Sequence, residues 1–172
     1  MINKLIRNGH KFFFFDLDKT IWNCHDKYGN EIWGKQMIVP FAQIPTNGQY
    51  DGNSIIDDVG SICQLQDGIR EVLSILDEQQ RIIGVCSASK NMNFEYQISQ
   101  PCIQLLKAFF IDQYFSIYHL NWKTVCKANV LKNYEQCVLF DDNKQIIEEC
   151  MQTENITPIA RYNFQNWKEM LQ

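Results

Sequence analysis

The chain has 172 residues, of which 45% are hydrophobic and 21% charged, and its formal net charge is −4. This length fits one domain with room for an insertion, and the apolar fraction is high enough to fill a core. The acidic balance argues against a nucleic-acid partner, and no stretch approaches the length of a membrane span. The first residues do not form a signal-peptide pattern, so we expect a soluble cytoplasmic protein with no membrane partner.

Seven cysteines are scattered along the chain without a C-x-x-C pair, and several fall inside apolar runs. An odd number without paired spacing is typical neither of a zinc site nor of a disulfide framework. We therefore expect all seven to be reduced and to pack as core residues. They are Cys24, Cys63, Cys86, Cys102, Cys126, Cys137 and Cys150.

Residues 12–20 contain the strongest local pattern, four consecutive phenylalanines followed by Asp16-Leu17-Asp18-Lys19-Thr20. The four aromatic residues predict a strand that is buried on both faces, as in a parallel sheet. If the extended geometry continues, Asp16 and Asp18 leave the end of this strand on the same side. Two carboxylates that close would raise each other's pKa unless a divalent metal intervenes or one of them is protonated. A turn rich in aspartate, without a chemical role, is the alternative interpretation.

Residues 21–66 differ in composition from the rest of the chain. They hold five glycines and two prolines and show no sustained helical period. We expect short strands and turns that form a small cap inserted after the first strand of a single domain spanning residues 1–172. Such a segment could cover a site at the strand end, and a surface excursion without a role in chemistry is the alternative. Residues 1–11 indicate only a polar lead-in.

After residue 67, helical and strand patterns alternate. Helical spacing of apolar residues predicts helices over residues 69–80, from Pro101 to Phe109, over residues 123–133 and 144–152, and a last helix capped by Asn163. Short apolar runs predict strands over residues 81–86, 114–120, 137–140 and 157–162. Together with the phenylalanine strand, these elements predict an α/β domain with a doubly wound, Rossmann-like parallel sheet of about five strands.

Ligands of such sheets bind outside the carboxyl ends of the strands. Those ends, and the helix after the third strand, carry Asp16, Asp18, Ser87, Lys123 or Lys127, Asp141 and Asp142. Carboxylates from two strand ends suit Mg²⁺, which prefers oxygen ligands and accepts a phosphate in its coordination shell. A hydroxyl and an ammonium in the same place are the further groups that a phosphate needs. The pattern therefore predicts a site for Mg²⁺ and a phosphate ester.

These segments, in this order, resemble the four motifs of the haloacid dehalogenase superfamily. Residues 16–20 are similar to its D-x-D-x-T motif, residues 85–87 to the second motif, a lysine near position 123 to the third and residues 139–142 to the fourth. The resemblance covers the chain except residues 21–66, which sit where this superfamily carries its first cap insertion. Residues 16–22 and 140–143 look most like the magnesium-dependent phosphatase and FkbH-like group, subfamily IIIC.

The resemblance implies a Mg²⁺-dependent phosphomonoester hydrolase that forms an aspartyl-phosphate. Asp16 would be the nucleophile and a metal ligand, and Asp18 the general acid and then the base. Asp18 would also offer its backbone carbonyl to Mg²⁺. Asp141 would bind Mg²⁺ through its side chain, and Asp142 directly or through water. Ser87 and the lysine would hold the phosphoryl oxygens.

Two choices remain within this interpretation. Lys123 follows the third strand at about the superfamily's spacing and is preferred as the phosphate-binding lysine, although Lys127 has the better apolar pattern behind it. Trp22, Trp33 and Trp122 flank motif or cap segments, where packing in the core or at the rim is the default and stacking on a substrate is the alternative.

The substrate class remains broad at this stage, a phosphorylated small molecule or a phosphoprotein. No feature of the sequence indicates an oligomeric state. Two other functions stay open. One is an FkbH-like protein that transfers a glyceryl unit and removes its phosphate with a carrier protein. The other is a non-catalytic phosphate-binding domain, against which the intact Asp16, Asp18 and Asp141 speak.

Overall fold

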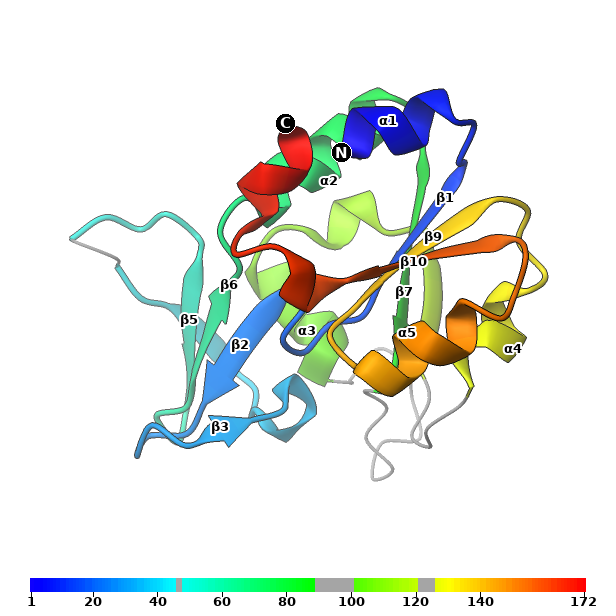
Figure 1. Cartoon of the computed structure of the whole chain (residues 1–172). Helices are drawn as coiled ribbons and strands as arrows, with labels where there is room; N and C mark the ends of the chain where they lie inside the picture. The colour runs from blue at the N-terminus through cyan, green and yellow to red at the C-terminus, as the bar shows by residue number, and fades with distance from the viewer. Residues whose placement is uncertain (46–47, 89–100, 121–125) are drawn as a thin grey trace.

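A parallel sheet of five strands lies at the centre of the computed structural model, which describes residues 1–45, 48–88, 101–120 and 126–172 (Figure 1). Its strands follow the order β10-β9-β1-β7-β8, and each neighbouring pair is parallel. They are β1 (Phe12–Phe15), β7 (Ile82–Ser87), β8 (Ile117–Leu120), β9 (Cys137–Asp141) and β10 (Ile156–Ala160). The predicted α/β architecture is thus confirmed.

The phenylalanine strand β1 is the middle strand of this sheet. Phe13 and Phe15 are buried in one core cluster, and Phe14 is buried in a second cluster. Because successive side chains of a strand point to opposite faces, these clusters cover the two sides of the sheet. Phe15 pairs with Val85 of β7 and with Phe140 of β9, so the chain leaves all three strands at the same edge.

Helices precede or connect most of these strands. They are α1 (Ile2–Arg7), α2 (Ile69–Glu78), α3 (Pro101–Ala108), α4 (Lys127–Leu131) and α5 (Lys144–Cys150). No helix in the described part of the chain is long and apolar enough to span a bilayer.

Two predictions about the chain ends were wrong. Residues 1–11 contain α1, in which Ile2 and Leu5 are buried. The helix was missed because six residues are too few to show a helical period in the sequence. The last α-helix capped by Asn163 is replaced by two 3₁₀ segments, η4 (Arg161–Asn163) and η5 (Trp167–Leu171), and Asn166 precedes the second.

A second, antiparallel sheet forms the cap within residues 21–66 and has the strand order β3-β2-β6-β5-β4. Its elements are β2 (Trp22–His25), β3 (Glu31–Ile32), the 3₁₀ turn η1 (Gly34–Gln36), β4 (Phe41–Gln43), β5 (Ser54–Asp57) and β6 (Ile62–Leu65). The short strands expected from the glycines and prolines are therefore present. Figure 1 shows this sheet beside the central one, reached directly from the end of β1.

Contacts between the cap and the helices fix the position of the cap. Trp22, at the start of β2, is fully buried and stacks on Phe109, with 6.1 Å between the ring centroids. Arg70 of α2 donates hydrogen bonds from Nη2 to the carbonyl oxygens of Gly52, at 2.7 Å, and of Phe109, at 2.6 Å. One guanidinium thus ties a cap loop to two helical segments.

Two of the seven cysteines form a disulfide, so the expectation that all are reduced was wrong. Cys24 of β2 and Cys63 of β6 are direct cross-strand partners, with 4.1 Å between their Cα atoms. The pairing depends on the register of two strands that lie 39 residues apart, which the cysteine spacing does not reveal. The other five cysteines are not part of a disulfide, and four of them are buried.

Candidate active site

The parallel register brings two aspartates together at the carboxyl edge of the central sheet. Asp16 directly follows β1, Asp141 ends β9, and the backbone N–H of Asp16 donates to the carbonyl oxygen of Phe140 over 2.9 Å. Asp142 is the next residue of the chain. Asp16, Asp141 and Asp142 each offer one carboxylate oxygen, and these oxygens lie within 4.8 Å of one another. The structure thus gathers three of the four predicted metal ligands.

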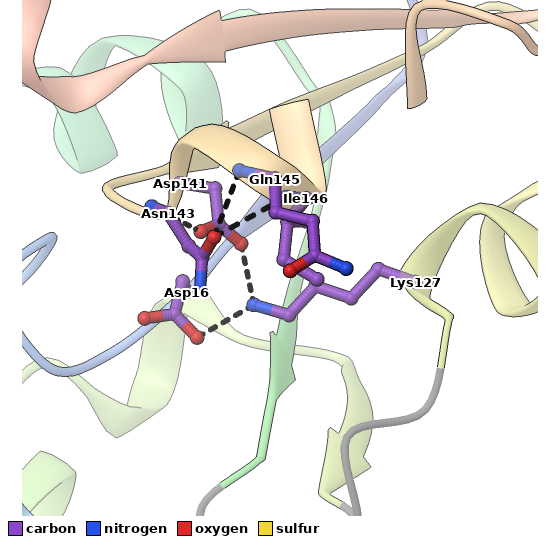
Figure 2. Close-up of polar contacts among 6 residues, drawn as sticks. All are labelled: Asp16, Lys127, Asp141, Asn143, Gln145 and Ile146. Atoms are coloured by element: carbon purple, nitrogen blue, oxygen red, sulfur yellow. Dashed lines mark hydrogen bonds and ion pairs between the residues drawn. The ribbon is translucent and has the colours of Figure 1, made fainter. Parts of the chain in front are cut away.

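Lys127 joins this group from the first residue of α4. Figure 2 shows its Nζ between two carboxylates, 2.7 Å from Oδ1 of Asp16 and 2.5 Å from Oδ2 of Asp141. Burial by itself would lower the pKa of Lys127, but the two carboxylates outweigh it and raise the pKa, so the ammonium form is stabilised. The preferred lysine of the sequence analysis, Lys123, lies outside the described residues.

The acidic cluster holds more negative charge than Lys127 can neutralise. When all three carboxylates are ionised they exceed the single ammonium by two charges. Burial, reinforced by Asp16 and opposed by Lys19, raises the pKa of Asp142 to about 6. Burial likewise raises the pKa of Asp141 above its usual range, although Lys127 opposes the shift. Three close oxygen donors with an excess of two charges fit a hard divalent cation such as Mg²⁺.

Asp18 is not one of these three carboxylates and is held by hydrogen bonds from the cap. Its Oδ1 accepts hydrogen bonds from Nε1 of Trp22, at 2.9 Å, and from the backbone N–H of Gly34, at 2.6 Å. Burial raises the pKa of Asp18 to about 6, and these two hydrogen bonds only partly offset the rise. Asp18 is therefore partly protonated at about pH 6.

A turn follows directly after Leu17. The carbonyl oxygen of Leu17 accepts hydrogen bonds from the backbone N–H groups of Thr20, Ile21 and Trp22, and Lys19 has a φ of +62°. Asp16 and Asp18 have different hydrogen-bond partners, and it stays a prediction that their side chains leave the strand end on the same side. Whether the carbonyl of Asp18 binds a metal stays a prediction.

Ser87 ends β7, the strand next to β1 on the side opposite β9. It is buried, and the register places it one residue beyond the level of Asp16. The neighbouring thiol of Cys86 is no alternative nucleophile, because burial raises its pKa to about 12 and keeps it protonated. The serine thus reaches the same edge as the acidic cluster, as its place in the sequence predicted.

Sequence reasoning missed three residues that support this site. Asn143 donates its backbone N–H to Oδ1 of Asp141 at 2.8 Å, and its side chain caps α5 through Gln145 and Ile146 (Figure 2). An asparagine before a helical run is a recognisable N-cap signal. Trp22 and Gly34, the two donors to Asp18, carry no such local signal because their role depends on how the cap folds.

Comparisons with known proteins find similar solved structures but no matching sequence family. No protein-family model and no curated protein sequence matches the chain. Among solved structures it is similar to a phosphatase candidate from Clostridium difficile, with 15% identity and a TM-score of 0.54, over 94% of this chain and 90% of the other. A predicted phosphoglycolate phosphatase from Haemophilus somnus 129PT is similar with 16% identity and a TM-score of 0.53, over 92% and 90% of the two chains.

A haloacid dehalogenase-like family hydrolase from Streptococcus pneumoniae is also similar, with 14% identity and a TM-score of 0.51, over 89% of this chain and 85% of the other. At such low identity the likeness speaks for the fold and not for the activity. The chain therefore has the fold of the haloacid dehalogenase-like proteins.

Proposed function

We propose that the chain is a Mg²⁺-dependent phosphomonoester hydrolase of the haloacid dehalogenase superfamily, most similar to its magnesium-dependent phosphatase group. One observation carries the proposal. Asp16, at the end of the central strand, shares a buried ammonium with Asp141, while Asp18, two residues later, is held by neutral donors with its pKa raised to about 6. Two carboxyl groups in such different surroundings suit two different tasks.

The first task is nucleophilic attack. A carboxylate oxygen of Asp16 would form a bond to phosphorus as the bond from phosphorus to the ester oxygen breaks. Lys127 holds Oδ1 of Asp16 at 2.7 Å and so fixes the direction of the side chain. The ammonium, together with the hydroxyl of Ser87, would also contact the phosphoryl oxygens, whose charge must be balanced in the transition state.

The second task is proton transfer. Asp18 would give its proton to the departing ester oxygen, and the alcohol would leave. In the next step Asp18 would take a proton from the water that hydrolyses the acyl phosphate, releasing inorganic phosphate and restoring Asp16. Proton transfer by a positioned side chain typically contributes roughly 10²- to 10⁴-fold in rate.

Asp16, Asp141 and Asp142 would hold Mg²⁺ through their side chains, and the backbone carbonyl of Asp18 is a further candidate ligand. When bound, the ion would neutralise charge on the phosphoryl group and orient it toward Asp16. The excess of two negative charges in the cluster supports this assignment.

The other two functions use the same site differently. A non-catalytic phosphate-binding domain would need a cation such as Lys127, but it has no use for a second buried acid with a raised pKa. An FkbH-like transfer of a glyceryl unit would require a carrier protein for turnover, whereas a phosphatase releases phosphate without one.

The test is hydrolysis of p-nitrophenyl phosphate and of a panel of phosphorylated metabolites, with Mg²⁺ and with EDTA. We expect phosphate release that requires Mg²⁺ and is lost in Asp16→Asn. Asp77→Asn makes the same chemical change at an exposed position of α2 and should leave the rate unchanged. Turnover that is absent for every ester, or that persists in Asp16→Asn, would refute the proposal.

A further inference from the structure

The cap places an exposed indole beside the acid of the proposed reaction. Gly34 donates its backbone N–H to Oδ1 of Asp18 at 2.6 Å, and Trp33 is the residue before it. Trp33 is 47% exposed, and among the described residues no other aromatic ring packs on it. The turn that carries this indole thus begins within hydrogen-bond distance of the Asp18 carboxylate.

This turn is tightly fixed. A Cβ atom at Gly34 would lie 2.9 Å from Cδ1 of Leu105, 2.9 Å from Nε1 of Trp22 and 3.1 Å from Oδ1 of Asp18. Only glycine allows the backbone to come so close. The backbone N–H of Trp33 also donates to Oε1 of Gln36 at 2.8 Å, which closes the turn. The position of Trp33 relative to Asp18 is therefore set by the fold.

A lysine links the indole to the acidic cluster. Nζ of Lys19 lies 5.4 Å from the ring centroid of Trp33 and 2.5 Å from Oε1 of Glu31. The hydrogen bond that Lys19 donates to Glu31 does most to raise the pKa of Lys19, and the charges of Asp142 and Asp18 also raise it. Lys19 directly follows Asp18 in the chain, so the indole against which it rests is at the rim of the proposed site.

The geometry of phosphoryl transfer indicates that the leaving group of the substrate lies at this rim. The attacking and leaving oxygens lie roughly in line through phosphorus, so the leaving group departs on the side away from Asp16. Asp18 must reach the leaving oxygen to protonate it, and Asp18 is bonded to the cap turn. The leaving group consequently meets the residues that flank Gly34.

We propose that Trp33 is a specificity-determining residue, which stacks on the leaving group and favours phosphomonoesters whose alcohol carries a flat, unsaturated ring. This inference rests on the proposed phosphatase activity and adds the class of alcohol to it. Stacking of a planar ring on an indole stabilises it beyond simple burial. Lys19 lies against the indole and keeps the ring in place for the substrate.

The test compares benzyl phosphate with cyclohexylmethyl phosphate, two alkyl esters of similar size that differ in whether the ring is flat. We expect the wild-type protein to prefer the benzyl ester in kcat/KM. Trp33→Leu should reduce that preference by roughly three- to tenfold, the range for losing one stacked aromatic pair. Trp33→Phe, which keeps a flat ring, should retain most of it.

Tyr28 provides a matched control on the same cap. It is 78% exposed, and Nζ of Lys27 lies 5.2 Å from its ring centroid, so it also pairs an exposed ring with a lysine. It belongs to the turn between β2 and β3, at the end of the cap far from α5 in Figure 1. Tyr28→Leu should leave the preference unchanged.

Two outcomes would overturn the inference. If Trp33→Leu keeps the wild-type preference, whether or not kcat/KM falls equally for both esters, the indole does not stack on the leaving group. If Tyr28→Leu changes the preference as much as Trp33→Leu does, the effect is not specific to Trp33. In each of these cases the wild-type protein still hydrolyses both esters and the proposed function stands. A wild-type protein that hydrolyses neither ester would instead remove the proposed function and this inference together.

Discussion

Asp16 and Asp18 are two residues apart, yet their hydrogen-bond partners come from different parts of the molecule. The central sheet holds Asp16, and its hydrogen-bond partner is the buried ammonium of Lys127. The cap holds Asp18, and its partners are an indole N–H and a backbone N–H. One carboxyl group is therefore paired with a cation and the other with neutral donors. The difference fits the two roles proposed for these residues, nucleophile and acid.

We expect the largest effect from replacing Lys127, the cation that contacts Asp16 of the central sheet. Lys127→Met leaves two buried carboxylates without their shared partner and should lower the free energy of unfolding by about 3 to 5 kcal/mol near neutral pH. The loss should shrink at about pH 5, where Asp141, whose pKa burial raises to about 6, can be protonated instead. Urea unfolding in EDTA at neutral pH and at about pH 5 measures this loss in the free energy of unfolding. Lys132→Met, at an exposed position just after α4, is the control, and equal losses in the two variants would contradict the role given to Lys127.

The effect of replacing Asp18, the proposed acid, should depend on the leaving group of the ester. Asp18→Asn removes the proton donor and should lower kcat/KM for an alkyl phosphate by roughly 10²- to 10⁴-fold. The loss should be smaller for p-nitrophenyl phosphate, because nitrophenolate leaves without a proton. Steady-state rates for both esters test this prediction. Equal losses for the two esters would assign Asp18 a structural role.

Metal binding should depend on pH through the acidic cluster. The pKa of Asp142 is raised to about 6 in the folded protein, so its contribution to stability is present at low pH and is lost as the pH rises through about 6. The ionised form present above this pH is the form that would bind Mg²⁺ in the proposed site. Saturating Mg²⁺ should therefore raise Tm by several degrees at about pH 7.5 and by less at about pH 5.

Thermal melts with and without Mg²⁺ at the two pH values provide the measurement. Asp142→Asn should show a smaller rise than the wild-type protein at the higher pH. An equal rise at both pH values would contradict the assignment of these carboxylates to the metal.

The smallest effect comes from one donor to Asp18. The hydrogen bond from Trp22 lowers the pKa of Asp18, so Trp22→Phe should raise this pKa further above 6. A general acid works while it is protonated, so the alkaline limb of the kcat/KM profile should move to higher pH. Trp167→Phe is the matched control, since Trp167 is also fully buried and donates Nε1 to the carbonyl oxygen of Thr20 at 2.9 Å. Identical profiles for both variants would remove the Trp22 hydrogen bond from the mechanism.

The features that could be predicted from the sequence are those that depend on residues close together in the chain. Four adjacent phenylalanines identify a buried strand by themselves, and parallel strands bring their ends together, so Asp16, Asp141 and Asp142 could be placed at one edge. For the lysine, two local signals disagreed. Superfamily spacing favoured Lys123, while the apolar pattern favoured Lys127, and it is Lys127 that contacts Asp16 and Asp141 in the structure.

The rest depends on contacts between distant parts of the chain. Gly34 reaches Asp18 across 16 residues, and Cys24 pairs with Cys63 across 39. Both contacts require the register of the cap sheet, which glycines and prolines predict only as a set of turns and short strands. The hydrogen-bond donors of Asp18 could not be foreseen for the same reason, because both belong to the cap.

Arg70 limits how this protein could be redesigned. Its guanidinium holds Gly52 in the cap and Phe109 after α3 at once, although the arginine itself belongs to α2, outside the inserted segment. A graft that moved residues 21–66 alone onto another scaffold would leave this clamp behind. A transplant meant to exchange substrate preference would therefore have to carry α2 together with the cap. The segment to be moved is longer than the inserted residues 21–66.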